Sequence, residues 1–110
     1  MSLEGTIEPT PSDDVVTFSY TVRNVGREPV ELTFTDSGHA DVAVLEDGTE
    51  IWRHSEGRMY AQVMGQERLE PDESRTYDLE WSDPDPGSYT AVCELRASDR
   101  RCEARATFSV

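Results

Sequence analysis

The sequence has 110 residues, which suffices for one hydrophobic core, and we expect residues 1–110 to form a single domain. Asp and Glu number 23 against ten basic residues, and the formal net charge is −13. A surface this negative repels phosphate backbones, so the composition argues against nucleic-acid binding.

The acidic residues are spread along the whole chain, and every basic residue is Arg. Dispersed carboxylates keep a surface hydrated in concentrated salt, where ions also screen their repulsion, so we expect a halophilic host with salt-rich cells. The sequence opens without a basic and apolar leader, and its apolar runs fall short of the ~20 residues that span a bilayer. We therefore expect a cytoplasmic protein without a membrane partner. Residues 1–3 receive no function, because a cloning vector could have supplied them.

Apolar and polar residues alternate along most of the chain, with the period of two that indicates half-buried β-strands. The expected strands are residues 16–22, 30–34, 41–45, 50–55, 76–81, 89–95 and 102–110. Turns are expected at residues 24–27, 36–38, 47–48, 69–73 and 82–87, where Gly, Pro, Asp, Asn and Ser gather. About eight short strands without a convincing helix predict an antiparallel β-sandwich.

Some details stay open at this level. Residues 59–64 fit either an extended segment or a short helical turn, and we favour the extended segment; residues 65–68 are expected to be a loop. Tyr89 follows Gly87 as in the tyrosine corner of immunoglobulin-like sandwiches, although a plain core Tyr is equally compatible. Cys93 and Cys102 are expected to be free, buried thiols, since a turn centred on residues 99–100 would place Cys93 opposite Ala106.

The hairpin around Asp47 and Gly48 leads into a strand that carries Trp52, expected in the core, and then Arg53, His54 and Ser55. His54 and Ser55 are neighbours on a strand and should point to opposite faces, so they do not form a catalytic dyad. The spacing of His and Cys matches no metal motif, and no nucleophile elbow or phosphate loop occurs. We expect no enzyme activity and no metal or other cofactor, and a small hydrolase or metal protein ranks last among the hypotheses.

The turn beyond this hairpin is the better candidate for binding a partner, because it gathers polar, cationic and aromatic side chains. Arg and Tyr are frequent anchors of protein interfaces. From the residues alone, a solvated hairpin with salt-bridged arginines is the stronger interpretation. The candidate contact residues are Arg53, His54, Ser55, Glu56, Arg58, Met59 and Tyr60.

From residue 17 to residue 95, the chain resembles the BsuPI family of intracellular proteinase inhibitors. The resemblance rests on segments in the family's order: residues 20–34 (YTVRNVGREPVELTF), 37–44 (SGHADVAV), 47–48 (DG), 50–57 (EIWRHSEG), 59–63 (MYAQV), 69–73 (LEPDE), 77–81 (YDLEW) and 87–91 (GSYTA). The chain departs from the family where His54 replaces a common aromatic residue, Met59 or Tyr60 replaces a Phe, and Asp72 replaces a Gly.

This resemblance implies an immunoglobulin-like β-sandwich that restrains an intracellular serine proteinase. We expect inhibition by occlusion, with residues 54–60 filling part of the protease cleft. The alternative is a non-inhibitory protein–protein interaction module of the same fold with another protein as partner. In either case we expect a monomer or a weak dimer, because the negative charge opposes the pairing of exposed edge strands.

Overall fold

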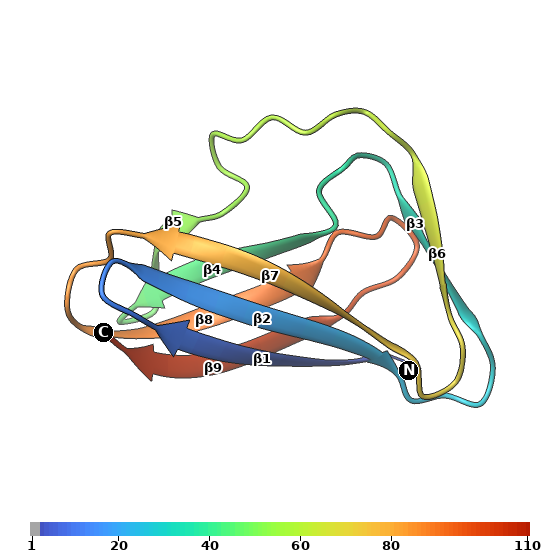
Figure 1. The fold of residues 1–110 in the computed structure, drawn as a ribbon, viewed down its shortest axis with the longest axis horizontal. Helices are drawn as coiled ribbons and strands as arrows, with labels where there is room; N and C mark the ends of the chain where they lie inside the picture. The colour runs from blue at the N-terminus through green and yellow to red at the C-terminus, as the bar shows by residue number, and fades with distance from the viewer. Residues whose placement is uncertain (1–2) are drawn as a thin grey trace.

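The computed structural model describes residues 3–110, which form nine antiparallel β-strands and no helix (Figure 1). The strands are β1 (Leu3–Pro11), β2 (Val15–Asn24), β3 (Val30–Phe34), β4 (Ala40–Glu46), β5 (Thr49–Arg53), β6 (Gly65–Leu69), β7 (Ser74–Ser82), β8 (Ser88–Leu95) and β9 (Glu103–Ser109). The expected all-β antiparallel sandwich is confirmed. Of residues 1–3, to which no function was given, Met1 and Ser2 lie outside the described residues, whereas Leu3 begins β1 opposite Asn24.

Two sheets face each other around the core. One has the strand order β1-β2-β7 and the other β5-β4-β8-β9, while β3 and β6 form a separate two-stranded pair. Figure 1 shows β2 and β7 lying across β4 and β8, with β3 and β6 at one end of the molecule. Alternate side chains of β2 are completely buried between the sheets, as the period of two predicted; they are Val16, Phe18, Tyr20 and Val22.

Strand β1 has no counterpart among the strands expected from the sequence. It contains Pro9 and Pro11, and prolines normally argue against a strand because they lack a backbone donor. β1 nevertheless tolerates them because it is an edge strand whose ladder pairs only with β2.

The expectation of a loop at residues 65–68 is wrong, because this segment belongs to β6. Its burial pattern alternates, but only Leu69 is fully buried, so the apolar period is missing from the sequence. The segment is a strand because it pairs with β3 along its whole length, although its own side chains do not show the pattern of a strand.

The hairpin between β4 and β5 turns at Asp47 and Gly48, as expected. Both residues have positive φ, 51° and 81°, which is the backbone of a type I′ turn. The Asp-Gly pair favours this turn because Gly has no Cβ to clash and Asp tolerates the left-handed region. Trp52 in β5 is partly buried and stacks on Trp81, with ring centroids 5.8 Å apart.

The sequence left open whether Tyr89 forms a tyrosine corner or is a plain core residue, and the structure decides between these alternatives. Tyr89 is buried, and its hydroxyl donates a hydrogen bond of 2.6 Å to the carbonyl of Asp85, so it forms the tyrosine corner.

Both cysteines are free and buried, but Cys93 lies opposite Ala104 rather than Ala106, because the β8–β9 connection is centred one residue earlier than expected. Burial raises the pKa of Cys93 to about 12, which leaves this thiol protonated and inert at neutral pH.

Candidate functional site

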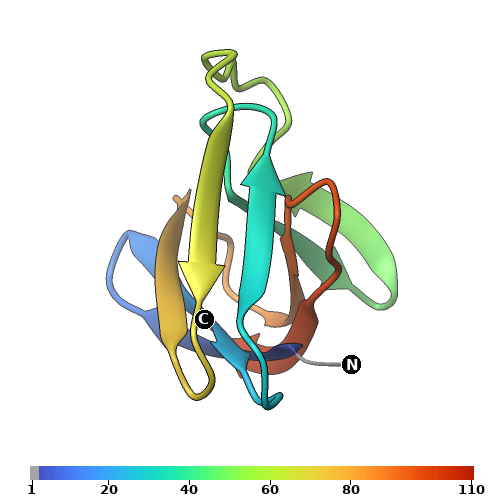
Figure 2. The same ribbon diagram turned by 90° about the vertical axis from the view of Figure 1, so that its right-hand side faces the viewer.

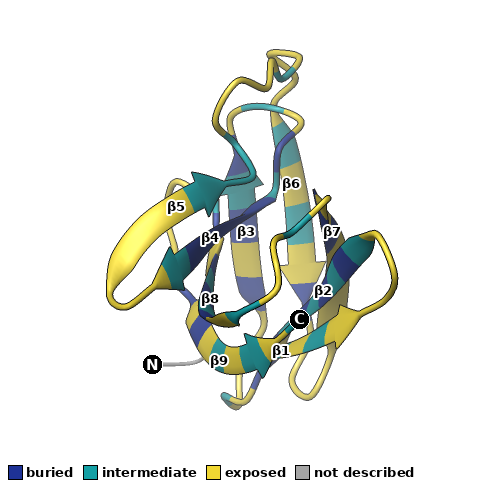
Figure 3. Ribbon diagram, turned by 90° about the vertical axis from the view of Figure 1, so that its left-hand side faces the viewer, coloured by how far each residue is buried: buried dark blue, intermediate teal, exposed yellow. Residues whose placement is uncertain are grey.

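The connection from β5 to β6, residues 54–64, is the most prominent exposed segment of the molecule, and we call it the apex loop. Figure 2 shows it above the ends of β3 and β6, and Figure 3 shows that most of it is exposed. Among the described residues, five large apolar side chains are exposed, and three of them belong to this loop: Met59 (98%), Val63 (60%) and Met64 (74%). Exposed apolar side chains gathered in one place point to a contact surface.

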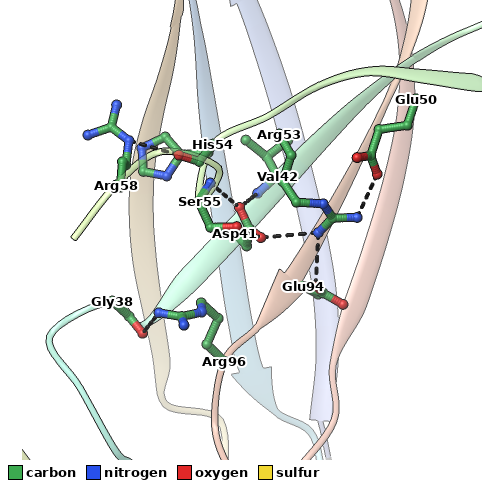
Figure 4. Close-up of polar contacts among 10 residues, drawn as sticks. All are labelled: Gly38, Asp41, Val42, Glu50, Arg53, His54, Ser55, Arg58, Glu94 and Arg96. Carbon is green, nitrogen blue, oxygen red and sulfur yellow. Dashed lines mark hydrogen bonds and ion pairs between the residues drawn. The ribbon is translucent and has the colours of Figure 1, made fainter. Parts of the chain in front are cut away.

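The first end of the apex loop is attached to the sandwich through a buried carboxylate, Asp41 of β4, which is only 4% exposed. Its oxygens accept hydrogen bonds from the backbone N–H of Ser55 at 3.0 Å and from the Ser55 hydroxyl at 2.6 Å (Figure 4). They also accept bonds from Nη1 of Arg53 at 3.1 Å and from the Val42 N–H at 2.9 Å. A buried charge is tolerated when it is paired and hydrogen-bonded in this way.

These bonds determine how Asp41 titrates. Burial by itself would raise its pKa, but the hydrogen bonds from Ser55 and Arg53 outweigh burial and hold the pKa below its usual value. Arg53 extends the cluster, since its guanidinium also donates to Glu50 at 2.7 Å and to Glu94 at 3.3 Å. The Arg53 and Ser55 side chains are therefore directed at the scaffold and hold the start of the loop in place.

His54 lies between these two residues in sequence, and its side chain points elsewhere. The strand expected over residues 50–55 ends at Arg53, so His54 and Ser55 belong to the turn that follows β5 rather than to the strand. The backbone N–H of His54 donates to the Val42 carbonyl at 2.9 Å, and its ring meets Trp52 edge-on. Within residues 3–110, Nδ1 of His54 is buried without a hydrogen-bond partner. Burial, followed by the positive charge of Arg58, lowers the pKa of His54. The Ser55 hydroxyl is bonded to Asp41, so His54 and Ser55 do not form a dyad.

Tyr60 anchors the far side of the loop on the β3–β4 connection. Its ring lies under the guanidinium of Arg96, with Arg96 Cζ 4.6 Å from the ring centroid. Arg96 is itself fixed by hydrogen bonds of 2.9 Å to the Asp36 carboxylate and to the Gly38 carbonyl. Gly38 is required here because a Cβ would lie 2.7 Å from Cε1 of Tyr60. Ala61 adds a backbone anchor, since it accepts from the Ser37 N–H at 2.9 Å and donates to the Ser37 hydroxyl at 3.0 Å.

Met59 stands between these anchors. On one side Nε of Arg58 donates to the His54 carbonyl at 2.8 Å, and on the other side Tyr60 and Ala61 are attached to residues 37–38 and to Arg96. Within the described chain, no hydrogen bond engages the backbone N–H or carbonyl of Met59. Of the three exposed apolar side chains of the loop, Met59 is the most exposed, and it lies between the two attached sides with its backbone polar groups unpaired among the described residues.

The seven candidate residues from the sequence accordingly separate into two groups. The side chains of Glu56, Arg58 and Met59 are exposed, whereas those of Arg53, His54, Ser55 and Tyr60 are partly buried and support the loop. Sequence reasoning did not select Asp41, although an acidic residue at the start of the apolar strand DVAVL is an available signal. It also did not select Arg96, for which an Arg after an apolar strand gives no comparable signal.

A comparison of the chain with models of known protein families finds the same family that the sequence resembles. The model of the BsuPI family, described as intracellular proteinase inhibitor, matches residues 3–100. The chain belongs to this family. No curated protein is similar enough in sequence to count as a relative.

Solved structures show the same fold at low sequence identity. The CARDB domain of PF1109 from Pyrococcus furiosus has a solution structure with a TM-score of 0.54 and 16% identity, and the match covers 99% of this chain and 94% of that one. A crystal structure of that domain in complex with di-metal ions has a TM-score of 0.55 and 16% identity, with 98% and 86% covered. A β-glucosidase from Kluyveromyces marxianus also matches, with a TM-score of 0.55 and 16% identity over 98% of this chain, but the chain spans only 14% of that enzyme.

These matches carry the fold, and the CARDB domains place it among immunoglobulin-like sandwiches. Within residues 3–110, His, Cys, Asp and Glu form no group of three or more that could hold a metal ion. The same residues include no helix that is long and apolar enough to cross a membrane.

Proposed function

We propose that this protein inhibits an intracellular serine proteinase by placing the apex loop in the protease's active-site cleft. Membership of the BsuPI family supports a protease as partner. The observation that carries the mechanism is the exposure of Met59, at 98%, on a loop whose two sides are attached to the sandwich. A loop that is already ordered loses little conformational entropy on binding, which favours affinity. The exposed Glu56, Arg58 and Met59 are the proposed contact residues, and the protein itself performs no catalysis.

The test is a titration of the host's intracellular serine proteinase, at molar salt, with increasing amounts of this protein. Hydrolysis of a chromogenic peptide should fall in proportion to the inhibitor added and stop near equimolar inhibitor. The matched control is a variant with Glu56 and Met59 both changed to Ser, which keeps the Arg58 bond to the His54 carbonyl and the buried anchors and should inhibit far more weakly than the wild type. Full protease activity at micromolar wild-type protein would refute the proposal.

We also infer that the host is halophilic and that the protein works in its salt-rich cytoplasm. The net charge of −13 and the absence of Lys support this inference. Several arginines pair with carboxylates at the surface, as Arg23 does with Asp72 at 3.0 Å, but the excess of acid remains large. Self-repulsion should then loosen the fold at low ionic strength, and the melting temperature should rise when salt is raised from millimolar to molar concentration. A melting temperature that does not change over this range would argue against a halophilic origin.

A further inference from the structure

We propose that Met59 is the residue that enters the primary specificity pocket of the protease, so that the partner is a serine proteinase with an apolar pocket. This inference rests on the proposed function, because it specifies which residue of the apex loop makes the decisive contact. Met is a long, unbranched and apolar side chain, and it fills an irregular apolar pocket easily. Met59 is almost fully exposed, so nothing in its own fold needs to move before it inserts.

The surroundings of Met59 in the sequence also favour an apolar partner. Residues 57–66 contain no Asp or Glu, although the chain as a whole carries 23 acidic residues. A protease cleft can therefore close over this segment without burying a carboxylate, which would be costly without a partner charge. Concentrated salt weakens contacts between exposed charges, whereas apolar burial does not depend on such charges. An apolar anchor is accordingly suited to a salt-rich cytoplasm.

The backbone around Met59 is free to pair with the walls of a cleft. Within the described residues, the backbone hydrogen bonds nearest to Met59 on either side involve the Arg58 N–H and both polar groups of Ala61, but neither backbone group of Met59 or Tyr60. Extended peptides commonly bind by adding their backbone to a strand of the partner. The segment from Met59 to Tyr60 can bind in this way while residues 54 and 61 stay attached to the sandwich.

The anchors also explain why the protease would be inhibited rather than simply supplied with a substrate. Attack by the catalytic serine forms a bond from its oxygen to the Met59 carbonyl carbon, breaks the bond to the Tyr60 nitrogen and passes the serine proton to that nitrogen through the protease histidine. Ala61 is held by Ser37 and Tyr60 by Arg96, so the new amine stays beside the acyl group. It can then attack the acyl carbon, restore the peptide bond and return the proton to the serine.

A pair of variants within the same loop tests this inference against the protease that the wild type inhibits. Met59→Glu should raise the inhibition constant about 100-fold or more, because buried central contacts dominate interface energies. The matched control, Met64→Glu, places the same charge at another exposed Met of the loop and should change the constant by only about 3-fold. Met59→Leu should inhibit nearly as well as the wild type. Both Glu variants should fold normally, because neither side chain is buried.

The outcomes separate the two proposals. If the wild type inhibits and Met59→Glu inhibits equally well, or if both Glu variants lose inhibition equally, the assignment of Met59 is wrong while the proposed function stands. If the wild type inhibits no serine proteinase, both proposals fall. Mass spectrometry of the complex should show slow and incomplete cleavage between Met59 and Tyr60. Rapid, complete cleavage at this bond would show that the loop is a substrate and would overturn the inference.

Discussion

Ser55 donates two hydrogen bonds to one buried carboxylate, from its N–H at 3.0 Å and from its hydroxyl at 2.6 Å to Asp41. These two residues are 14 positions apart and join the start of the apex loop to the interior of the sandwich. The Ser55→Ala variant keeps the N–H bond but loses the hydroxyl, and it should lower the free energy of unfolding by about 2 kcal/mol, because bonds to buried charges are the stronger kind. Urea unfolding at molar salt measures the loss.

Ser98→Ala is the matched control for Ser55→Ala. The Ser98 hydroxyl donates a long bond of 3.3 Å to the Thr33 carbonyl in an exposed setting. Its loss should lower the free energy of unfolding by only about 0.5 kcal/mol or less. Equal losses in the two variants would contradict the special role of the Asp41 carboxylate.

The charge of Asp41 should also make part of the free energy of unfolding depend on pH. Its pKa is lower in the folded protein than in the unfolded chain, where it is about 3.9. The stabilisation from its charged form is thus complete above the unfolded pKa and is lost as the pH falls through the folded pKa. We expect the difference in unfolding free energy between the wild type and Asp41→Asn to be constant above about pH 5 and to shrink in more acidic solution. A difference that stays constant down to the acid transition would show that the charge of Asp41 does not contribute.

The strands of the sandwich could largely be predicted from the sequence, whereas the role of the Asp41 carboxylate could not. Strands such as β2 bury one face and expose the other, so alternation alone reveals them. The strands β1 and β6 were missed because prolines and polar residues hide their alternation, and pairing with a neighbour decides their structure. The partners of Asp41 come from another strand and a turn, at distances in sequence that a single chain does not disclose. For the same reason, sequence reasoning found the polar turn but did not separate its exposed residues from its anchors.

The burial of His54 should lower the free energy of unfolding, and a single substitution should remove this loss. Its Nδ1 is buried without a partner in the described structure, and burial followed by Arg58 lowers its pKa. Because the unfolded chain then binds protons more readily than the folded protein, stability should fall as the pH drops below about 6.5, the usual pKa of His. His54→Phe puts an apolar ring against Trp52, and it should raise the free energy of unfolding by about 1 kcal/mol near pH 7.

The pH profile tests this explanation of His54 directly. The wild type should lose stability between about pH 7 and pH 5, and His54→Phe should show a flatter profile over the same interval. His39→Gln serves as the control for the other histidine of the chain and should leave the contribution of His54 in place. A profile for His54→Phe as steep as that of the wild type would show that His54 is not the titrating group.

The ring of Tyr60 packs directly against Gly38, and this contact should connect the order of the apex loop to inhibition. In Gly38→Ala, the new Cβ would lie 2.7 Å from the Tyr60 ring and would also press on Arg96, so the ring has to leave its place. We expect faster hydrogen exchange at residues 58–62 and about 10-fold weaker inhibition, because the loop must then be ordered at the moment of binding. The matched control is Gly65→Ala at the other end of the loop, where a Cβ would have no atom within 4 Å. If Gly38→Ala accelerated exchange in the loop without weakening inhibition, the order of the loop would not be what makes this protein an inhibitor.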